Sequence, residues 1–492
     1  MRDTIRFLFR GEIKELVNPS PTQTILEWLR LDMAQTGTKE GCAEGDCGTC
    51  TVAVGELYGN TIRYQAINSC IRFMPTLDGK HLLTVEDLKS PDGKLHPVQQ
   101  SLVQQHGSQC GFCTPGIVMS LFAHYCAEGS TDRATIDTTL AGNLCRCTGY
   151  GSIIAAAQAA QTISEKYCVN QKPDQTIARL NSIKPLDSVA LKHNGRQYFA
   201  PVAAQRLAEM LQEHPTAVLL SGGTDVGLWV TKQHRSLATV IYTGNVAELN
   251  AIKVGADHIE IGAATTYTDS IELLTTHFPD FGEILRRLGA TQVRNAGTIG
   301  GNVGNGSPIG DTLPVLIALG ASVRLRRVTG VREIALQDYF IDYGVQDREQ
   351  GEFIESISVP LLKHKALFGA YKVSKRFDED ISAVLAAFSL EIENGKVCKA
   401  SIAYGGMAAI PKRASACEQA LVGACWNETN MERAVAALVE DFTPLTDWRA
   451  SANYRSKVAA NLLRRFWLEH SGIGQATRIL GHEVRIAELV TE

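Results

Sequence analysis

Cysteine spacing constrains this chain more than any other feature of its sequence. Ten of its 13 cysteines lie before residue 170, and eight of those ten stand in closely spaced groups. The first ten residues, Met1–Arg10, alternate polar and apolar side chains and do not form a secretory signal, so we expect a cytoplasmic protein with reduced thiols. Grouped reduced thiols are typical of metal ligands, so the backbone must form loops that bring them together. The isolated cysteines are expected to be small buried apolar residues: Cys126, Cys168, Cys398, Cys417 and Cys425.

The first group has the spacing C-x4-C-x2-C with a distant fourth cysteine, which is that of plant-type [2Fe–2S] ferredoxins. Its members are Cys42, Cys47, Cys50 and Cys70. Three glycines in residues 41–48 permit the unusual dihedral angles that a loop around a small cluster needs. Structural zinc sites also use C-x2-C pairs, but the four-residue interval and the glycine-rich loop favour the iron–sulfur interpretation.

The sequence around this group predicts a small β-grasp domain over residues 1–88. Thr4–Phe9, Thr51–Val54 and Thr61–Ala66 are typical of strands, and Thr22–Leu31 has apolar residues at helical spacing. The last of these strands would lead directly to Cys70.

The second group consists of two pairs, C-x2-C and C-x-C. Its members are Cys110, Cys113, Cys145 and Cys147. Helical sequence follows the pairs at Ile117–Cys126 and Gly151–Ala160, and another helix is expected at Ile136–Gly142. Because helix N-termini stabilise negative charge, residues 89–167 are expected to form a four-helix bundle with a metal centre between helix ends. Taken alone, this spacing is also compatible with zinc.

Two glycine-rich segments mark the second half of the chain, after a polar stretch at residues 168–194 that we expect to be a linker. At 217–227 an apolar strand runs into Gly222-Gly223 and then a helix, a turn that presents backbone N–H groups to a phosphate. Residues 294–311 are rich in glycine and poor in bulky side chains, which indicates close approach of the backbone to a ligand. Farther on, strands are expected at Ala383–Ile392 and Val397–Tyr404. A helix whose apolar stripe packs in the core is expected in Ser451–Leu468.

Three cysteine-containing segments together resemble the iron–sulfur domains of the molybdenum hydroxylases, the family of xanthine dehydrogenase and aldehyde oxidase. These segments are Gly41–Cys50, Gln109–Gly116 and Cys145–Tyr150. The resemblance implies two [2Fe–2S] clusters on the eight grouped cysteines and places Gln109 against a molybdopterin. The family usually has Arg-Pro after the Cys-Thr-Gly-Tyr sequence, whereas this chain has Gly151-Ser152.

The two glycine-rich segments and Phe368–Ser382 resemble the FAD-binding part of the same family. The implied architecture is α+β and multidomain, with a two-lobed FAD-binding domain at residues 195–365 and a C-terminal α/β subdomain at 366–492. The residues implied to bind FAD are Val218, Leu219, Leu220, Ser221, Gly222, Gly223, Thr224, Asp225, Thr298, Ile299, Gly300, Gly301, Asn302, Asp311, Ile354 and Lys372.

The domain order resembles the N-terminal half of xanthine dehydrogenase and implies an electron-transfer subunit. A large molybdopterin-binding partner would hydroxylate hypoxanthine or xanthine to urate, and a heterotetramer is implied. Electrons would pass through the two clusters to FAD and on to NAD⁺, with no catalytic residue for the substrate chemistry on this chain. Two alternatives stay open: a subunit of another hydroxylase, such as carbon monoxide dehydrogenase or an N-heterocycle hydroxylase, or a stand-alone NADH:acceptor iron–sulfur flavoprotein.

Charge and hydropathy give no indication of a nucleic-acid or membrane partner. The formal net charge of −4 gives no reason to expect a nucleic acid or an anionic membrane surface. No apolar stretch approaches the roughly 18 residues of a membrane span.

Overall fold

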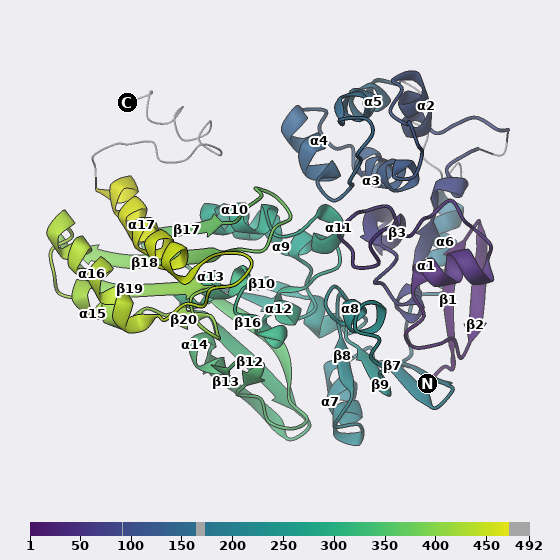
Figure 1. Ribbon diagram of the computed structural model, residues 1–492. Helices are drawn as coiled ribbons and strands as arrows, with labels where there is room; N and C mark the ends of the chain where they lie inside the picture. The colour runs from purple at the N-terminus through teal and green to yellow at the C-terminus, as the bar shows by residue number, and fades with distance from the viewer. Residues whose placement is uncertain (91, 164–172, 472–492) are drawn as a thin grey trace.

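The computed structural model describes residues 1–90, 92–163 and 173–471 of the 492-residue chain. Figure 1 shows a small sheet and a helical unit at one end, a two-lobed α+β region in the middle, and a helix-covered sheet at the other end. This is the α+β multidomain architecture that the sequence predicts. In the described residues, no helix is both long and apolar enough to cross a membrane.

The N-terminal unit is a five-stranded sheet of order β2-β1-β5-β3-β4 in which β1 and β5 are parallel. Its strands are β1 (Thr4–Phe9), β2 (Glu12–Val17), β3 (Thr51–Tyr58), β4 (Thr61–Asn68) and β5 (His81–Leu83). Helix α1 (Ile25–Glu27) continues as a π-helical turn (Trp28–Asp32). Trp28 packs edge-on against Phe7 and Phe9 of β1, with ring centroids 5.3 Å apart in both pairs. The predicted β-grasp arrangement is confirmed.

Four helices form the next unit, above the N-terminal sheet in Figure 1. They are α2 (Pro97–Gln104), α3 (Thr114–Cys126), α4 (Arg133–Leu140) and α5 (Gly151–Thr162). Cys113 is the N-cap residue of α3, so this cysteine lies at a helix N-terminus as predicted. Helix α5 begins at Gly151 although the family's Arg-Pro is missing there, and its N-cap Tyr150 has a left-handed backbone with φ of 66°.

The two-lobed region contains one sheet in each lobe. The first sheet has the order β6-β7-β9-β8 and the second β10-β11-β16-β12-β13. The first lobe contains β6 (Val189–His193), β7 (Arg196–Ala200), α7 (Ala204–Glu213), β8 (Val218–Leu220), α8 (Val226–Thr231) and β9 (Thr239–Tyr242). The second contains β10 (Ile252–Val254), β11 (His258–Gly262), α9 (Tyr267–His277), α10 (Pro279–Arg286), α11 (Thr291–Arg294), α12 (Ile299–Asn305), α13 (Thr312–Ala318), β12 (Ser322–Arg327), β13 (Gly330–Ala335), α14 (Leu336–Tyr339), β14 (Phe340–Asp342), β15 (Val345–Gln346) and β16 (Phe353–Pro360).

The C-terminal unit is a four-stranded sheet of order β17-β18-β19-β20 with three helices. Its elements are β17 (Leu367–Val373), β18 (Val384–Glu393), β19 (Lys396–Gly405), β20 (Lys412–Arg413), α15 (Ser415–Leu421), α16 (Glu428–Asp441) and α17 (Ala452–His470). Phe466 of α17 stacks on Phe388 of β18 with ring centroids 5.0 Å apart. The predicted apolar stripe of this helix is therefore core packing.

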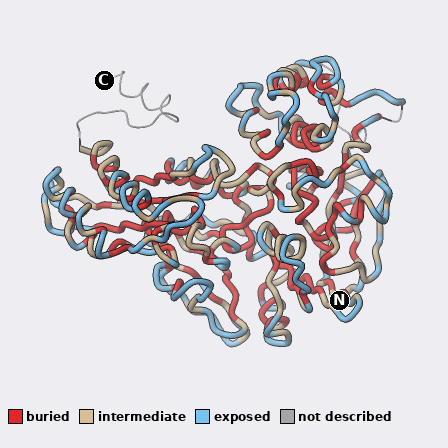
Figure 2. The backbone as a smooth tube through the Cα atoms, in the orientation of Figure 1, coloured by how far each residue is buried: buried red, intermediate tan, exposed pale blue. Residues whose placement is uncertain are grey.

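The N-terminal unit and the first flavin lobe share one hydrophobic core. Phe7 and Trp28 belong to the same buried cluster as Tyr198 of β7 and Val240 of β9. The burial in Figure 2 continues across this junction. The N-terminal sheet is therefore joined to the first flavin lobe by core packing.

The prediction of a linker at residues 168–194 is wrong for most of the described part of that interval. Helix α6 (Pro173–Ser182) and strand β6 occupy it. Leu180 and Ile183 are buried against Leu8 of β1, so this segment packs on the N-terminal sheet. Pro173 at the first helical position is a helix-start signal that the polar composition obscured. Residues 168–172 lie outside the described residues.

The prediction for the isolated cysteines is only partly right. Cys417 is buried and Cys126 half-buried, but Cys398 and Cys425 are exposed. Cys398 lies on the solvent side of β19, and Cys425 precedes α16, so strand alternation and a surface turn override their apolar character. Cys168 lies outside the described residues.

Candidate iron–sulfur and flavin sites

The first cysteine group gathers in the loop before β3 and in the turn after β4. Hydrogen bonds between thiols connect Cys42 to both Cys47 and Cys70, and Cys70 also to Cys50. The backbone N–H groups of Glu44 and Cys47 both donate to the Cys42 sulfur at 3.4 Å. Side-chain hydrogen bonds, from Cys47 first and then Cys70, hold the pKa of the Cys42 thiol far below its usual range. Thiolate ligands and N–H donors aimed at sulfur are what an iron–sulfur cluster requires.

The second group gathers near the N-termini of α3 and α5. Cys113 is hydrogen-bonded to Cys145, and Cys110 to Cys147. The backbone N–H of Cys145 donates to the Tyr150 hydroxyl at 2.8 Å, which ties its loop to the start of α5. Burial raises the pKa of the Cys113 thiol to about 12. Cys110 and Cys147 are exposed, so one pair of this group faces the surface.

Each group brings four thiols together, which is the number of protein ligands that a [2Fe–2S] cluster takes. Each iron of a [2Fe–2S] cluster takes two protein thiolates, whereas a structural zinc ion takes four ligands around one point. Both groups thus fit the clusters that the sequence predicts.

The two cluster loops touch each other through the backbone. The N–H of Leu144 donates to the carbonyl oxygen of Cys47 at 3.1 Å. A Cβ on Gly116 would collide with the Gly48 carbonyl oxygen, so helix α3 approaches the first loop as closely as glycine allows. One hydrogen bond therefore links Cys47 to the residue before Cys145, and both cysteines are predicted cluster ligands.

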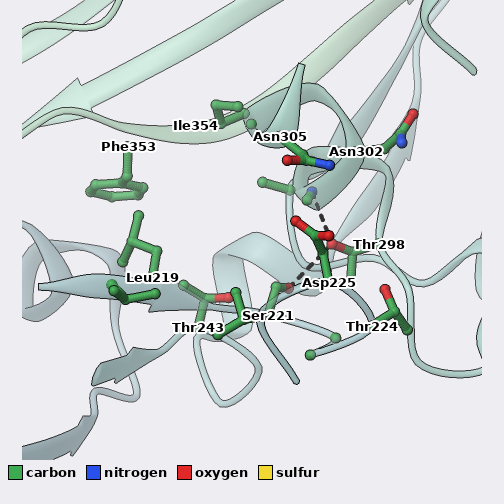
Figure 3. A pocket seen from close by; sticks show the side chains of 18 of the residues that line it. Leu219, Ser221, Thr224, Asp225, Thr243, Thr298, Asn302, Asn305, Phe353 and Ile354 are labelled. Atoms are coloured by element: carbon green, nitrogen blue, oxygen red, sulfur yellow. Dashed lines mark hydrogen bonds between the residues drawn. The ribbon is translucent and has the colours of Figure 1, made fainter. Parts of the chain in front are cut away.

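A cavity of about 680 Å³ lies between the two flavin lobes (Figure 3). That volume suits a ligand of dinucleotide size. Figure 3 shows Leu219 and Phe353 together on one side and the polar Thr224 and Asn302 on the other. Twelve of the 16 residues predicted to bind FAD line it: Val218, Leu219, Ser221, Gly222, Gly223, Thr224, Asp225, Thr298, Gly300, Gly301, Asn302 and Ile354.

Two turns from different lobes meet at this cavity and fit a diphosphate. A Cβ on Gly222 would collide with the Ala296 carbonyl oxygen, and Gly223 has a φ of +77° that favours glycine. Across the cavity Thr298 caps α12 by accepting from the Gly301 N–H at 3.0 Å, and its hydroxyl donates to Ser221 at 3.2 Å. Backbone N–H groups at the starts of α8 and α12 are thereby brought to one place, as anion binding needs.

Four predicted FAD residues do not line the cavity. Leu220 and Ile299 are buried in the hydrophobic core. Asp311 lies close behind the cavity wall, because the hydroxyl of its neighbour Thr312 donates to Asn302, which lines the cavity, at 2.6 Å. Lys372 forms an ion pair with Asp311 at 2.6 Å, so the two are brought together. Separately, Gln109 is exposed beside Cys110 and far from this set in sequence.

Several residues of the cavity wall were not predicted from the sequence. The missed aromatic and basic side chains are Trp229, Arg235, Tyr267, Tyr339, Arg348 and Phe353. They stand outside the glycine-rich segments, on elements that tertiary folding brings together. Phe353 directly precedes Ile354 on β16, and this is the one local signal that could have found it.

The first cluster loop also touches the cavity. Ile71, which follows ligand Cys70, lies so close to Gly227 that a Cβ there would meet its carbonyl oxygen at 2.5 Å. Arg72 donates to the Gly222 carbonyl oxygen at 2.9 Å and to the Tyr242 hydroxyl at 3.2 Å. The Gly222-Gly223 turn at the cavity is thus contacted by the two residues that follow Cys70, a predicted cluster ligand.

Four family models match successive parts of the chain. Residues 9–71 match a 2Fe-2S iron–sulfur cluster binding domain and 84–158 a [2Fe-2S] binding domain. Residues 192–362 match the FAD binding domain in molybdopterin dehydrogenase, and 369–470 the CO dehydrogenase flavoprotein C-terminal domain. The chain belongs to the molybdenum hydroxylase family. It carries the iron–sulfur and FAD domains of that family.

Curated relatives in this family include much longer proteins. Xanthine dehydrogenase 1 of Arabidopsis thaliana is 30% identical over 91% of this chain and 38% of its own length. Xanthine dehydrogenase of Emericella nidulans is 30% identical over 94% of this chain and 38% of its own length. The chain therefore spans about 38% of the length of these relatives.

Two solved structures superpose on a little more than half of this chain. A CO dehydrogenase chain from Oligotropha carboxidovorans superposes with a TM-score of 0.51 and 27% identity, covering 55% of this chain and 94% of that one. A chain of quinoline 2-oxidoreductase from Pseudomonas putida 86 has a TM-score of 0.52 over 57% and 98%. At 23% identity, this second match shows the fold alone.

Proposed function

We propose that this chain transfers electrons from the molybdenum centre of a large molybdopterin-binding partner to NAD⁺, in a cytoplasmic heterotetramer that hydroxylates hypoxanthine and xanthine to urate. Bound clusters would supply single-electron steps, and FAD would combine them into a two-electron step. The chain's own residues hold these groups in order and contribute no catalytic residue to the purine chemistry.

The observation that carries this proposal is the unbroken line of contacts between the three sites. Exposed Cys110 and Cys147 stand at one end, beside Gln109, where a partner could approach. The hydrogen bond from Leu144 to Cys47 joins the second loop to the first. Ile71 and Arg72 then join the first loop to the flavin cavity.

Two features support the xanthine type over other hydroxylases. The xanthine dehydrogenase relatives align over more than nine tenths of this chain, with iron–sulfur and flavin parts fused. The CO dehydrogenase and quinoline oxidoreductase chains align over only 55–57% of it. The CO dehydrogenase likeness nevertheless favours one second candidate, a subunit of another molybdenum hydroxylase.

Stopped-flow reduction of the purified chain by NADH without oxygen tests the NAD⁺ assignment. Flavin bleaching should come first and cluster bleaching should follow, because the cavity lies at one end of the line of contacts. Absence of flavin reduction by NADH, with full reduction by dithionite, would contradict NAD⁺ as the acceptor.

Co-purification tests the partner. A large molybdopterin-containing chain recovered in a one-to-one ratio, with xanthine-dependent cluster reduction, is the expected result. A purified homo-oligomer that reduces acceptors with NADH, and needs no other chain, would support the stand-alone flavoprotein instead.

A further inference from the structure

Gln292 of the flavin half reaches into both cluster-binding units at once. It lies on α11, and its side chain is only 1% exposed. Its Nε2 lies 3.2 Å from Thr51 Oγ1, 3.1 Å from Ser120 Oγ and 3.0 Å from Asn143 Oδ1. Thr51 follows ligand Cys50 in the first unit, whereas Ser120 and Asn143 belong to the second. One side chain thus bonds across the junction of three domains.

The surrounding groups determine which way the Gln292 amide points. The Gly48 carbonyl can only accept, so the Asn143 Nδ2 that lies 3.2 Å from it must be the donor. Asn143 Oδ1 consequently faces Gln292 and needs a donor, and in the described part of the chain Nε2 of Gln292 is that donor. The hydrogen bond to Asn143 therefore leaves the buried Oε1 of Gln292 without a partner among the described residues.

Two of the residues that Gln292 contacts, Asn143 and Thr51, lie next to the hydrogen bond that joins the two cluster loops. Asn143 directly precedes Leu144, whose N–H donates to the carbonyl of ligand Cys47. Thr51 donates its hydroxyl to the Gly48 carbonyl at 2.6 Å, in the same loop as Cys47. The three segments are closely packed here, because a Cβ on Gly142 would collide with Gln292 Oε1 and with Ala290. A substitution of Gln292 would thus shift the residues that flank both the donor and the acceptor of the Leu144–Cys47 hydrogen bond.

We propose that Gln292 is a positioning residue for electron transfer: from the flavin half, it fixes the separation and orientation of the two cluster loops. This inference rests on the proposed electron-transfer function. It adds that the flavin half does more than receive electrons, because it also sets the geometry of the step between the clusters.

The test uses the full-length protein with both clusters reduced by dithionite. Two reduced clusters are paramagnetic neighbours, and the splitting that each causes in the other's EPR signal depends steeply on their separation and orientation. Gln292→Leu has a similar volume but no amide, so it should keep its iron content and alter this splitting. Electron redistribution between the clusters after a photochemical single-electron pulse should slow severalfold.

Asn295→Ala is the matched control. Asn295 lies three residues along the chain and donates to the Ala66 carbonyl at 2.9 Å, so it bridges the flavin half to the first unit but does not touch the second. The EPR splitting and the rate of electron redistribution between the clusters should be the same in Asn295→Ala as in the wild type. A lost interdomain bond of purely structural importance would lower thermal stability in both variants and leave the splitting unchanged in both.

Gln292→Asn is a second variant for use if Gln292→Leu loses iron. It keeps a buried amide but is too short to reach Asn143, so a smaller change in the same direction is expected. Wild-type splitting in every iron-replete Gln292 variant would overturn the inference and leave the proposed function intact. A wild-type protein with both clusters but no electron exchange between them would overturn the proposed function itself.

Discussion

Lys372 and Asp311 form a buried ion pair that joins the C-terminal sheet to the second flavin lobe. The Lys372 Nζ lies 2.6 Å from Asp311 Oδ2, and the two side chains are 1% and 8% exposed. Ser382 donates to the other carboxylate oxygen at 2.5 Å, and Lys372 also donates to the Arg287 carbonyl at 3.2 Å. Two residues expected to bind FAD therefore bind each other, just behind the cavity.

Replacing Lys372 by methionine should destabilise the protein by about 3 kcal/mol, because it leaves the Asp311 carboxylate buried without its partner. Thermal unfolding of the flavin-bound protein measures this loss. The double variant Lys372→Met with Asp311→Asn should recover much of it, since no buried charge remains. Unchanged stability with an altered flavin spectrum would instead support direct contact between Lys372 and the flavin.

The gathering of the first cysteine group was predictable because its signal is local. Cysteine spacing and glycines within ten residues predict the Cys42–Cys50 loop, and Cys70 follows after the two strands β3 and β4. The two glycine-rich turns that meet at the cavity were predictable for the same reason. The ion pair between Lys372 and Asp311 was not, because 61 residues separate its members and only the packing of β17 on the second lobe brings them together.

Helix α6 and the role of Gln292 could not be predicted, because both depend on tertiary contacts that leave no periodic pattern in the sequence. Helix α6 contributes one side of a small cluster with Leu8, and its apolar residues are too few to stand out from a polar segment. Gln292 has no motif at all: its importance comes from Thr51, Ser120 and Asn143, which lie on three other segments. Residues that join domains are therefore found from the structure and not from spacing.

Gly222→Ala should abolish FAD retention. Its Cβ would strike the backbone carbonyl of Ala296, which cannot move aside as a flexible side chain can, so the diphosphate turn must shift. Flavin content after gel filtration measures the effect, and iron content should stay at the wild-type level. Gly151→Ala is the control, because no atom lies within 4 Å of its Cβ. Normal flavin content in Gly222→Ala would contradict the assignment of this turn to the diphosphate.

Arg72→Met should weaken FAD binding roughly tenfold while both clusters remain. The variant loses hydrogen bonds from a charged donor to the Gly222 carbonyl and the Tyr242 hydroxyl, interactions typically worth about 1.5–3 kcal/mol. Titration of the deflavinated protein with FAD gives the affinity. Arg63→Met is a matched control, since Arg63 also bridges to the flavin half, through a part-exposed pair with Asp269, and should matter little. Equal affinities in both variants would show that Arg72 does not support the turn.

Cys113→Ser should remove one cluster and leave the other. Iron should fall from about four to about two atoms per chain, because each [2Fe–2S] cluster depends on its own four thiolates. Iron analysis together with EPR of the reduced protein identifies the surviving signal as that of the first group. Cys398→Ser, at an exposed cysteine outside both groups, should keep all the iron. Loss of both clusters in Cys113→Ser, with the protein still folded, would show that the groups are not independent.

Acid should destabilise the N-terminal sheet through His81 of β5. Burial lowers the pKa of His81 from about 6.5 to about 4, and its Nδ1 lies 3.1 Å from the Tyr64 hydroxyl. The folded state therefore keeps His81 neutral while the unfolded chain takes up a proton. The stability present above pH 6.5 is lost as the pH falls toward 4, at about 1.4 kcal/mol per pH unit.

His81→Gln removes this titration and keeps a polar partner for Tyr64. Between pH 6.5 and 5.5 the variant should lose about 1 kcal/mol less stability than the wild type, measured by denaturant unfolding of the cluster-loaded protein. His234→Gln changes an exposed histidine and should follow the wild-type pH dependence. If His81→Gln and wild type lose stability equally over this range, His81 is not the group that makes the sheet sensitive to acid.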